Sequence, residues 1–297
     1  MHSFEFQFAK IALALVLFTA TKTTACSQTI YQNNFDQHTA ATVYTKDIWQ
    51  ADWSSPKWEN GVEQGRVSIV SGQQAYGGTG NSLAISYPSG KFGTQNTGAQ
   101  WRLELSGKHE ELYSSYRIKF KTGFDFVRGG KLPGLGGGST PTGAKKATGV
   151  NGWSGRMMWR TDFQGTPGNP AQLTSRVISY AKYANSGFNN LGEQADKKYL
   201  RDAAKNLITL KSGVWFSIAQ RIKMNDPGIA NGIIQIWVDN VKVFDQNDVL
   251  FRTDEKLKID VFYFSTFFGG SNKAWATSKH ETVLFDDFVV RRPNSNN

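Results

Sequence analysis

Three short segments of the sequence place cations and a tyrosine at the two-residue spacing of a β-strand. Lys131 lies in GGKLPGLGGG at 129–138, which we interpret as a turn-rich loop because Gly and Pro dominate it. Further on, WSGRMMWR at 153–160 reads as a strand, and side chains on a strand share a face at every second position. One face of this strand therefore carries Ser154, Arg156, Met158 and Arg160. Cations that converge beside a loop predict a site for an anionic ligand.

Two more predicted strands, at 99–105 and 176–184, each have a polar face and an opposite face. The polar faces carry Gln100, Arg102, Arg176, Tyr180 and Lys182, and the opposite faces carry Trp101, Leu103, Ser179 and Tyr183. If these strands are neighbours, they form a basic, concave sheet. The solvated face of an antiparallel sheet is normally polar as well. For each residue taken alone, an ordinary surface position is therefore the simpler interpretation.

The composition is that of a globular protein with a strong positive charge. The chain has 297 residues, of which 39% are hydrophobic, 20% charged and 13% aromatic, and its formal net charge is +10. Such a charge attracts polyanions. No helix-turn-helix, zinc-finger or RNA-recognition pattern occurs, so we expect an acidic polysaccharide as the partner and not a nucleic acid.

The N-terminal residues 1–25 read as a secretory signal peptide. Lys10 precedes the apolar run IALALVLFTA at 11–20, which is too short to span a bilayer, and small residues follow it. No later run is long enough for a transmembrane segment either. Export is therefore expected. Cys26, the one cysteine of the chain, excludes a disulfide and leaves open a lipoprotein anchor at the mature N-terminus.

Residues 26–297 read as one all-β domain, because short alternating runs follow each other between clusters of Gly, Asn and Pro. The expected strands are 31–36, 81–88, 99–105, 113–120, 156–160, 176–184, 215–224, 233–240, 258–268 and 282–290. Asp239-Asn240 predicts a two-residue hairpin. The closing strand at 282–290 is expected to pair with the opening strand at 31–36. The one expected helix is 193–205.

Several of these segments resemble polysaccharide lyase family 14, which comprises alginate lyases and related uronate lyases. The resemblance is carried by KLPGLGG at 131–137, WSGRMMWR at 153–160 and the Tyr-bearing strand after it, and also by 98–105 and 113–130. It runs in the same order through most of 80–290. It implies a β-jelly roll of two stacked antiparallel sheets, with the substrate-binding site on the concave face.

The resemblance also implies roles for individual residues. The family uses a Lys in the KLPGL segment, a Ser and an Arg two apart, and two Tyr two apart. Here these positions give the catalytic candidates Lys131, Ser154, Arg156 and Tyr180. The second Tyr position holds Lys182, so the sequence departs from the family pattern there. The expected substrate-binding residues are Gln100, Arg102, Arg160 and Lys182.

The residue types suit β-elimination from a polyuronate such as alginate or glucuronan. A uronate lyase removes the C5 proton beside a carboxylate and expels the oxygen on C4. Cations and hydrogen-bond donors must neutralise that carboxylate and hold the charge that develops, and Arg can bind it through two hydrogen bonds. Lys131, Ser154 and Arg156 fit this task. Tyr180 is the expected base and then acid.

Two other classes stay open on the same scaffold. A non-catalytic lectin would use the basic face only to bind an anionic carbohydrate, and the missing second tyrosine favours it. A glycoside hydrolase needs two carboxylates, for which Glu104, Glu110 and Glu111 are the candidates. A nuclease would need clustered histidines or carboxylates, and His38, His109 and His280 are scattered and read as surface residues.

No catalytic metal or other cofactor is expected, and the protein is expected to be a monomer. A structural Ca²⁺ near the paired ends of the domain, held by Asp36 or Asp287, stays open because both offer oxygen ligands.

Overall fold

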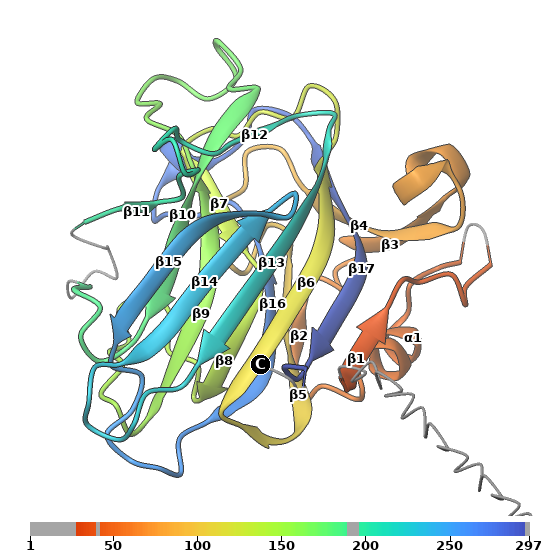
Figure 1. Cartoon of the computed structure of the whole chain (residues 1–297). Coiled ribbons are helices and arrows are strands. Elements are labelled where there is room, and N and C mark those ends of the chain that lie inside the picture. The colour runs from red at the N-terminus through yellow and green to blue at the C-terminus, as the bar shows by residue number, and fades with distance from the viewer. Residues whose placement is uncertain (1–27, 40–41, 189–195, 295–297) are drawn as a thin grey trace, which may run out of the picture.

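Two antiparallel sheets stacked on each other make up most of the protein (Figure 1). The computed structural model describes residues 28–39, 42–188 and 196–294. The predicted signal peptide at 1–25 and Cys26 lie outside the described residues. The expected all-β jelly roll is confirmed, and each of the ten expected strands is present with small changes at its ends.

Sheet A, at the front of Figure 1, has the strand order β15-β14-β13-β6-β17-β4-β3, and β1 pairs with β17. Its strands are β1 (Thr29–Asn33), β3 (Val67–Ser71), β4 (Asn81–Tyr87), β6 (Glu111–Phe120), β13 (Trp215–Lys223), β14 (Gly232–Val238), β15 (Val241–Val249) and β17 (Glu281–Arg291). The predicted hairpin is confirmed between β14 and β15, where Asp239 and Asn240 have φ of 49° and 65°. Both values suit the primed turns that join twisted strands.

Sheet B has the order β11-β10-β9-β8-β16-β5-β2; β7 pairs with β9, and β12 with β10. Its strands are β2 (Glu59–Asn60), β5 (Ala99–His109), β7 (Gly129–Leu132), β8 (Gly134–Gly138), β9 (Gly152–Arg160), β10 (Thr174–Lys182), β11 (Lys198–Tyr199), β12 (Thr209–Lys211) and β16 (Ile259–Thr266). Three predicted site strands, β5, β9 and β10, therefore lie in the same sheet.

The segment 129–138 is not a loop, which corrects the interpretation made from its Gly and Pro content. It forms β7 and β8, which pair with successive parts of β9 and are separated at Pro133. Gln220 from sheet A bridges the interruption, since its side chain accepts from the Leu135 N–H at 3.0 Å and donates to the Gly155 carbonyl at 2.6 Å. Glycine is needed for close packing: a Cβ on Gly130 would lie 2.0 Å from the Trp159 ring. Lys131 is therefore held in a strand and not in a mobile turn.

The helix expected at 193–205 is also wrong over its described part. Lys198 and Tyr199 form β11 and pair with Ser179 and Ile178 of β10. The helices of the described chain are α1 (Lys46–Asp52) and the 3₁₀ turns η1 (Gly72–Gln74), η2 (Tyr76–Gly78) and η3 (Lys273–Trp275). None of the helices found in the described ranges is long and apolar enough to cross a bilayer.

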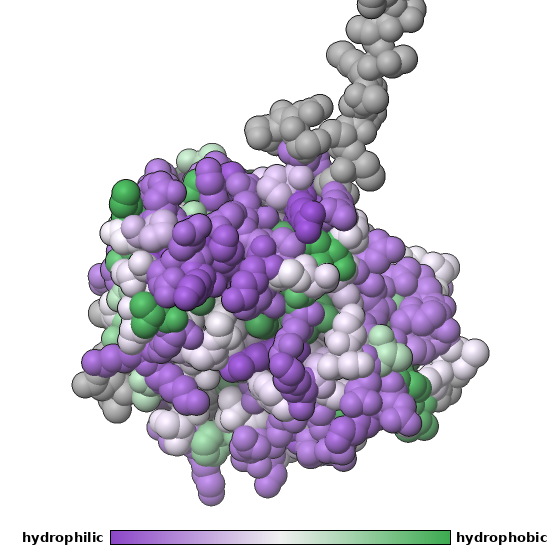
Figure 2. Space-filling view, turned by 90° about the horizontal axis from the view of Figure 1, so that it is seen from below, coloured by the Kyte–Doolittle hydropathy of each residue, from purple (hydrophilic) through white to green (hydrophobic). Residues whose placement is uncertain are grey.

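The core between the sheets is rich in aromatic side chains. Trp101 of β5 stacks on Phe264 of β16 with ring centres 4.1 Å apart, and Trp153, Met157 and Trp159 of β9 are fully buried. These residues hold one face of sheet B against sheet A, so the opposite face of sheet B points away from the core. In the view of Figure 2, hydrophilic residues cover most of the described surface and hydrophobic ones are scattered among them.

The first and last described strands are neighbours, as predicted. β1 pairs with β17, and Thr29 is the register partner of Arg291. This pairing joins the opening strand to sheet A, which is the sheet that does not carry the predicted site strands.

Candidate functional site

Strand register brings the predicted catalytic side chains onto one face of sheet B. Lys131 of β7 is paired with Met158 of β9, and Arg156 of β9 is paired with Tyr180 of β10. Paired residues of antiparallel strands point to the same side of the sheet. Because Trp153, Met157 and Trp159 alternate with this set and point into the core, the set faces outward. The separation of the two faces of β9, predicted from sequence, is confirmed.

A pocket of about 730 Å³ lies over this face. Its walls contain three of the residues predicted as catalytic, Lys131, Arg156 and Tyr180, and two of those predicted to bind substrate, Gln100 and Arg160. The other residues lining it are Gly93, Thr94, Thr142, Gly143, Met158, Ile178, Lys197, Tyr263, Phe267, Gly270, Ser271 and Trp275. None of these described lining residues is acidic, so the pocket is cationic and suits an anion.

Lys131 is a buried amine without an acidic partner. Its side chain is 8% exposed, and its Nζ lies 3.1 Å from Met158 Sδ and 3.3 Å from the centre of the Tyr180 ring. No ion pair among the described residues involves it. Burial, and then the nearby Arg156, Arg160 and Lys182, hold the pKa of this amine well below its ordinary range. The Lys131 amine is therefore neutral to a larger extent near neutral pH than an ordinary exposed lysine is.

Arg156 is a buried guanidinium with spare hydrogen-bonding capacity. It is 2% exposed, its Nη1 donates to Ser265 Oγ at 3.1 Å, and its Nε is buried with no hydrogen-bond partner in the described part of the chain. Burial lowers its pKa, yet an Arg stays protonated in proteins. Buried donors are normally satisfied, so this one is suited to a ligand oxygen.

Tyr263 of β16 belongs to the pocket, and sequence reasoning missed it. Its hydroxyl donates to Gln100 Oε1 at 3.1 Å, and Arg156 Cζ lies 5.1 Å from its ring centre. The tyrosine therefore connects Arg156 with Gln100. The run VFYFS at 261–265 could have indicated this residue, because Tyr263 alternates there with Phe262 and Phe264. Both phenylalanines are buried in the core.

One end of the pocket combines a cation with an indole. Arg160 Cζ lies 4.6 Å from the centre of the Trp275 ring, and both residues line the cavity. Trp275 comes from η3, which follows β16 in the chain. Sequence reasoning missed it too, because a single tryptophan in a loop carries no periodic signal. An aromatic face beside an arginine is suited to a sugar ring that bears a carboxylate.

Three other predicted site residues do not line the pocket. Ser154, expected to be catalytic, is fully buried and donates to the Pro141 carbonyl at 3.0 Å. Lys182 Nζ donates to the carbonyls of Gly143 and Lys145, at 2.5 and 2.9 Å. Arg102 Nη2 donates to the Ser139 carbonyl at 2.9 Å. Each side chain binds a backbone carbonyl instead of facing the cavity, because the segment 139–145 lies against the strands that carry them.

Tyr183, next to the missing second tyrosine, does not replace it. Its ring is buried against Phe251, with centres 5.8 Å apart, and its hydroxyl accepts from Lys198 Nζ and from Gln246 Nε2, both at 2.9 Å. The alternation of side chains predicted Tyr183 on the face opposite Tyr180 and Lys182, and the residue does pack in the core. Tyr180 and Tyr263 are therefore the two tyrosines of the described pocket lining.

The glutamates that a hydrolase would need are engaged elsewhere. Glu104 pairs with Lys57 at 3.0 Å, and Glu111 pairs with Arg221 at 2.8 Å. Glu110 pairs with Arg252 at 2.8 Å and Lys258 at 2.6 Å. Since the described lining of the pocket holds no Asp or Glu, the two carboxylates of a glycosidase are not available there.

Metal binding finds little support in the described residues. No group of three or more His, Cys, Asp or Glu side chains there could hold a metal ion. Of the Ca²⁺ candidates, Asp36 Oδ1 accepts the Asn81 N–H at 2.8 Å, and Asp287 Oδ2 lies 3.6 Å from Arg117 Nε. That catalysis needs no cofactor stays a prediction. Of the histidines read as surface residues, His109 is in fact buried in β5.

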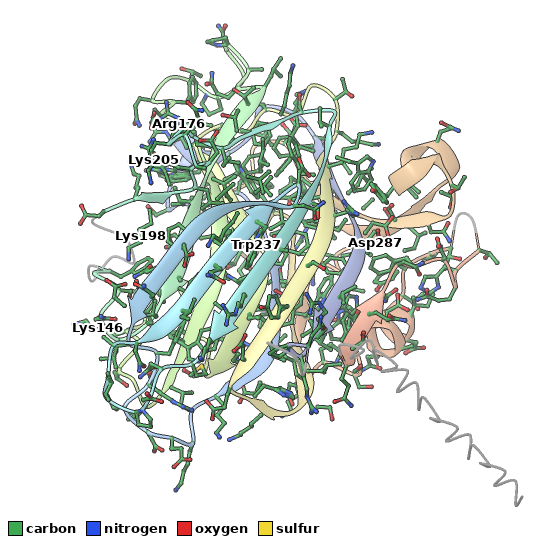
Figure 3. The ribbon with its side chains drawn as sticks, in the orientation of Figure 1. Lys146, Arg176, Lys198, Lys205, Trp237 and Asp287 are labelled. Atoms are coloured by element: carbon green, nitrogen blue, oxygen red, sulfur yellow. The ribbon has the colours of Figure 1, made fainter. Side chains whose placement is uncertain are left out.

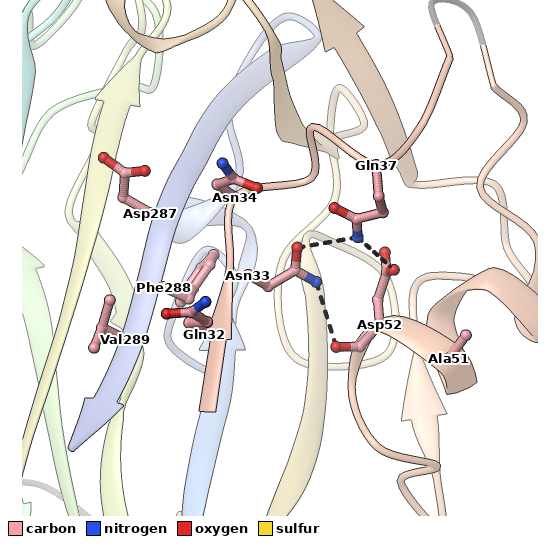
Figure 4. A pocket seen from close by; sticks show the side chains of 9 residues that line it. All are labelled: Gln32, Asn33, Asn34, Gln37, Ala51, Asp52, Asp287, Phe288 and Val289. Atoms are coloured by element: carbon pink, nitrogen blue, oxygen red, sulfur yellow. Dashed lines mark hydrogen bonds between the residues drawn. The ribbon is translucent and has the colours of Figure 1, made fainter. Parts of the chain in front are cut away.

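A second hollow, of about 630 Å³, lies beside β1 and β17 (Figure 4). Amide side chains dominate it, and its charged residues are Asp52 and Asp287. Gln37 Nε2 donates to Asp52 Oδ1 at 2.9 Å and to Asn33 Oδ1 at 3.2 Å, so much of its polar surface is satisfied internally. An acidic lining does not suit a polyanion, which leaves the cationic pocket as the candidate site.

Exposed and half-buried cations lie along the side of the molecule near β10 and β11. Figure 3 places Lys146, Arg176, Lys198 and Lys205 along that side, whereas Trp237 lies on sheet A. Lys197, next to Lys198, lines the pocket itself. Clustered like charges raise the local concentration of a ligand of opposite charge, so this side could guide a polyanion to the pocket.

Several solved structures of similar fold are alginate lyases. Aly36B has a TM-score of 0.70 and 20% identity over 90% of this chain and 98% of its own. The marine PL-14 alginate lyase from Aplysia kurodai has a TM-score of 0.67 and 21% identity over 90% and 100%. The alginate lyase vAL-1 from Chlorella virus has a TM-score of 0.55 and 21% identity over 80% and 100%. At these identities the likeness shows a shared fold.

Sequence comparison gives the family. No curated protein sequence matches the chain. Residues 76–288 match the family model of polysaccharide lyase 14, which is more than half of the chain and includes β5, β7, β8, β9, β10 and β16, the strands that carry the pocket. The chain belongs to polysaccharide lyase family 14.

Proposed function

We propose that the protein is a lyase that cleaves a polyuronate, alginate or glucuronan, by β-elimination and leaves a C4–C5 unsaturated uronate. The observation that carries this proposal is the contact between a buried amine without an acidic partner, Lys131, and a tyrosine ring, Tyr180, inside a cationic pocket. Membership of the family and the similar fold of alginate lyases support the substrate class.

Arg156 would bind the substrate carboxylate. Its buried Nε has no hydrogen-bond partner among the described residues, and a guanidinium can donate two parallel hydrogen bonds to a carboxylate. Neutralising that charge makes the neighbouring C5 proton more acidic and stabilises the enolate that forms when it leaves. Tyr263 and Ser265 hold Arg156 in position through ring contact and a hydrogen bond.

Lys131 would act as the base that removes the C5 proton. The sequence predicted that Lys131 neutralises the substrate carboxylate. Its lowered pKa favours the neutral amine, which can accept a proton. A general base works best when its pKa lies near the working pH. The amine takes the proton from C5, the C5–H electrons form the C4–C5 double bond, and the bond from C4 to the glycosidic oxygen breaks.

Tyr180 would donate its hydroxyl proton to that leaving oxygen, which becomes the hydroxyl at the new reducing end. The resulting tyrosinate is stabilised by the ammonium of Lys131 and by Arg156, whose Cζ lies 5.8 Å from the ring centre. Return of the proton from Lys131 to Tyr180 through solvent restores the starting state. Sequence reasoning assigned both proton transfers to Tyr180; the contact with Lys131 suggests dividing them.

Trp275 and Arg160 would bind a neighbouring sugar of the polymer. The indole offers an apolar face to a pyranose ring, and the guanidinium beside it suits that sugar's carboxylate. A second charged unit bound in this way would orient the chain so that one C5–H reaches Lys131.

The alternative function is a lectin that holds an anionic polysaccharide without cleaving it. It is favoured by one observation, that Lys182 occupies the position where the family pattern has a second tyrosine. The two functions share the cationic pocket and differ in whether Lys131 and Tyr180 turn over substrate.

A single assay separates these functions. Purified protein is incubated with alginate and, separately, with glucuronan, while ultraviolet absorbance reports the new double bond and a reducing-sugar assay reports chain cleavage. A lyase raises both signals together with at least one polymer. Binding without either signal would establish the lectin, and new reducing ends without absorbance would establish a hydrolase.

A further inference from the structure

The segment 139–145 is attached to sheet B through every second carbonyl group. The carbonyls of Ser139, Pro141, Gly143 and Lys145 each accept a hydrogen bond from a side chain of the sheet. The donors are Arg102 of β5, Ser154 of β9 and Lys182 of β10, with Lys182 serving the last two carbonyls. We call this segment the 139–145 wall.

The wall forms part of the pocket, whereas its three anchors do not. Thr142 and Gly143 line the cavity, and Arg102, Ser154 and Lys182 are not among its lining residues. Ser154 is 0% exposed and Lys182 is 2% exposed. A substrate in the pocket would therefore contact the wall and not the hydroxyl of Ser154 or the amine of Lys182.

The packing beneath the wall also depends on the sequence of β8. Gly136 is paired with Ser154, and a Cβ on Gly136 would lie 2.8 Å from Thr140 Cγ2. The missing side chain lets Thr140 approach the sheet, where it is 1% exposed. Glycine in β8 and the anchors on β5, β9 and β10 thus act on the same segment.

Two register partners provide three of the four anchoring bonds. Ser154 and Lys182 are opposite each other on β9 and β10. A tyrosine at position 182 carries no ammonium and could not donate to two carbonyls at once, whereas a lysine amine has up to three N–H donors. The departure from the family pattern at Lys182 therefore coincides with an attachment that needs a lysine.

We propose that Arg102, Ser154 and Lys182 are positioning residues that hold the 139–145 wall, and that the wall sets how the uronate chain fits into the pocket. They act on substrate binding through the wall and take no part in proton transfer. The kinetic part of this inference rests on the proposed lyase activity. The attachment of the wall itself does not, so the two can fail separately.

The test uses Ser154→Ala, Lys182→Met and the double variant in the full-length protein, with Lys146→Met as control. Lys146 is exposed and directly follows the wall, so its variant removes a nearby charge without removing an anchor. Ser154→Ala changes no charge and isolates the loss of a hydrogen bond. Hydrogen–deuterium exchange of the amides of 139–147 reports the attachment, and steady-state kinetics on the preferred polyuronate report the fit.

We expect faster exchange in 139–147 for both single variants and unchanged exchange for Lys146→Met, which loses one of the cations that could guide the polymer but no anchor of the wall. One lost hydrogen bond corresponds to a KM increase of about threefold to tenfold, and kcat should stay within about threefold. In the double variant the fold-increase in KM should be smaller than the product of the increases in the two single variants, because both anchors hold one segment.

Two results would overturn the inference. Unchanged exchange in Ser154→Ala and in Lys182→Met, with melting temperatures that show folded protein, would mean that the wall does not depend on these anchors. A loss of kcat of about a hundredfold or more in Ser154→Ala at unchanged KM would return Ser154 to the catalytic group. If the wild type cleaves no polyuronate, the proposed function fails, and exchange together with oligouronate affinity still decides whether the anchors hold the wall.

Discussion

The amine nitrogen of Lys131 lies 3.3 Å from the centre of the Tyr180 ring, and both side chains are at least nine-tenths buried. The two residues come from β7 and β10, which are not neighbours in sheet B but both pair with β9. β9 therefore acts as the common support of the two groups that we propose to move protons. The distance between them follows from strand register and not from a flexible loop.

Replacing Lys131 by Arg distinguishes a base from a mere counter-ion. Arg keeps the positive charge but cannot lose its proton in a protein. If Lys131 is the base, Lys131→Arg should lower kcat by about a hundredfold or more, as measured by the ultraviolet assay. In the wild type, kcat should rise with pH as the amine loses its proton. An Arg variant that retains a third of the activity would show that the charge, and not the neutral amine, is what the reaction needs.

Replacing Lys131 by Met should make the protein more stable. Because the pKa of the folded-state amine is lowered, the protonated form is the costly one, and the cost is fully present at low pH. In the unfolded chain the amine has an ordinary lysine pKa of about 10.4. Between the lowered folded-state pKa and this value, the unfolded chain binds more protons than the folded protein. Stability of the wild type should therefore rise with pH in that window.

Melting temperatures across this range provide the measurement. Lys131→Met should melt about 3 °C or more above the wild type near neutral pH, and the gap should narrow as the pH approaches the upper end of the window. Lys146→Met, which removes an exposed lysine, serves as control and should change little. Identical melting of wild type and Lys131→Met at every pH would show that burial of the amine has no cost.

Tyr180→Phe should abolish most turnover and leave binding intact. The ring that packs against Phe188, with centres 5.0 Å apart, is kept, and only the hydroxyl is lost. Loss of a general acid lowers kcat by about 10²- to 10⁴-fold. Tyr199→Phe on the neighbouring β11 is the matched control and should retain activity. A fully active Tyr180→Phe variant would remove the proposed acid while leaving the class of reaction unaffected.

Gly130→Ala should destabilise the fold through the strand that carries Lys131. The added Cβ would lie 2.0 Å from the Trp159 ring and 2.4 Å from the Phe267 carbonyl oxygen, so β7 would have to move. Overpacking of this kind costs about 1–3 kcal/mol. Gly77→Ala is the comparison: it has φ of +72° but open space, so its cost is conformational and about 1–2 kcal/mol. Chemical denaturation measures both, and a Gly130→Ala variant as stable as the wild type would contradict the close packing.

The alternation of side chains predicted the strands and their faces well. In β9, four large or apolar residues could be assigned to opposite faces from spacing alone, and the structure separates Trp153 and Trp159 from Arg156 and Met158 as expected. The reason is that the period of a strand is a local property, which the sequence displays directly. Arg156 and Tyr180 were found in this way, with the family resemblance, whereas Lys131 was found from its place in the Gly- and Pro-rich segment and from the resemblance.

The remaining differences depend on contacts between distant segments. The glycines of 129–138 resemble a loop in sequence, but they serve the close approach of Trp159 and of the backbone of β9. Ser154 was expected to be catalytic and Lys182 to bind substrate, since they share a face with Arg156 and with Tyr180, yet both side chains donate to carbonyls of the 139–145 wall. Trp275 enters the pocket from a short turn beyond β16. In each case the partner lies far away in the chain, so no local pattern could reveal it.

The pairing of Thr29 with Arg291 has a practical consequence for engineering. The first and last described strands end beside each other on sheet A, whereas the pocket opens on sheet B. The ends could be joined by a short linker and the chain reopened at the Asp239-Asn240 turn, since circular permutation succeeds at exposed loop tips. Such a permutant would present its new termini at the β14–β15 hairpin, and the order of β5, β7, β8, β9, β10 and β16 within sheet B would not change.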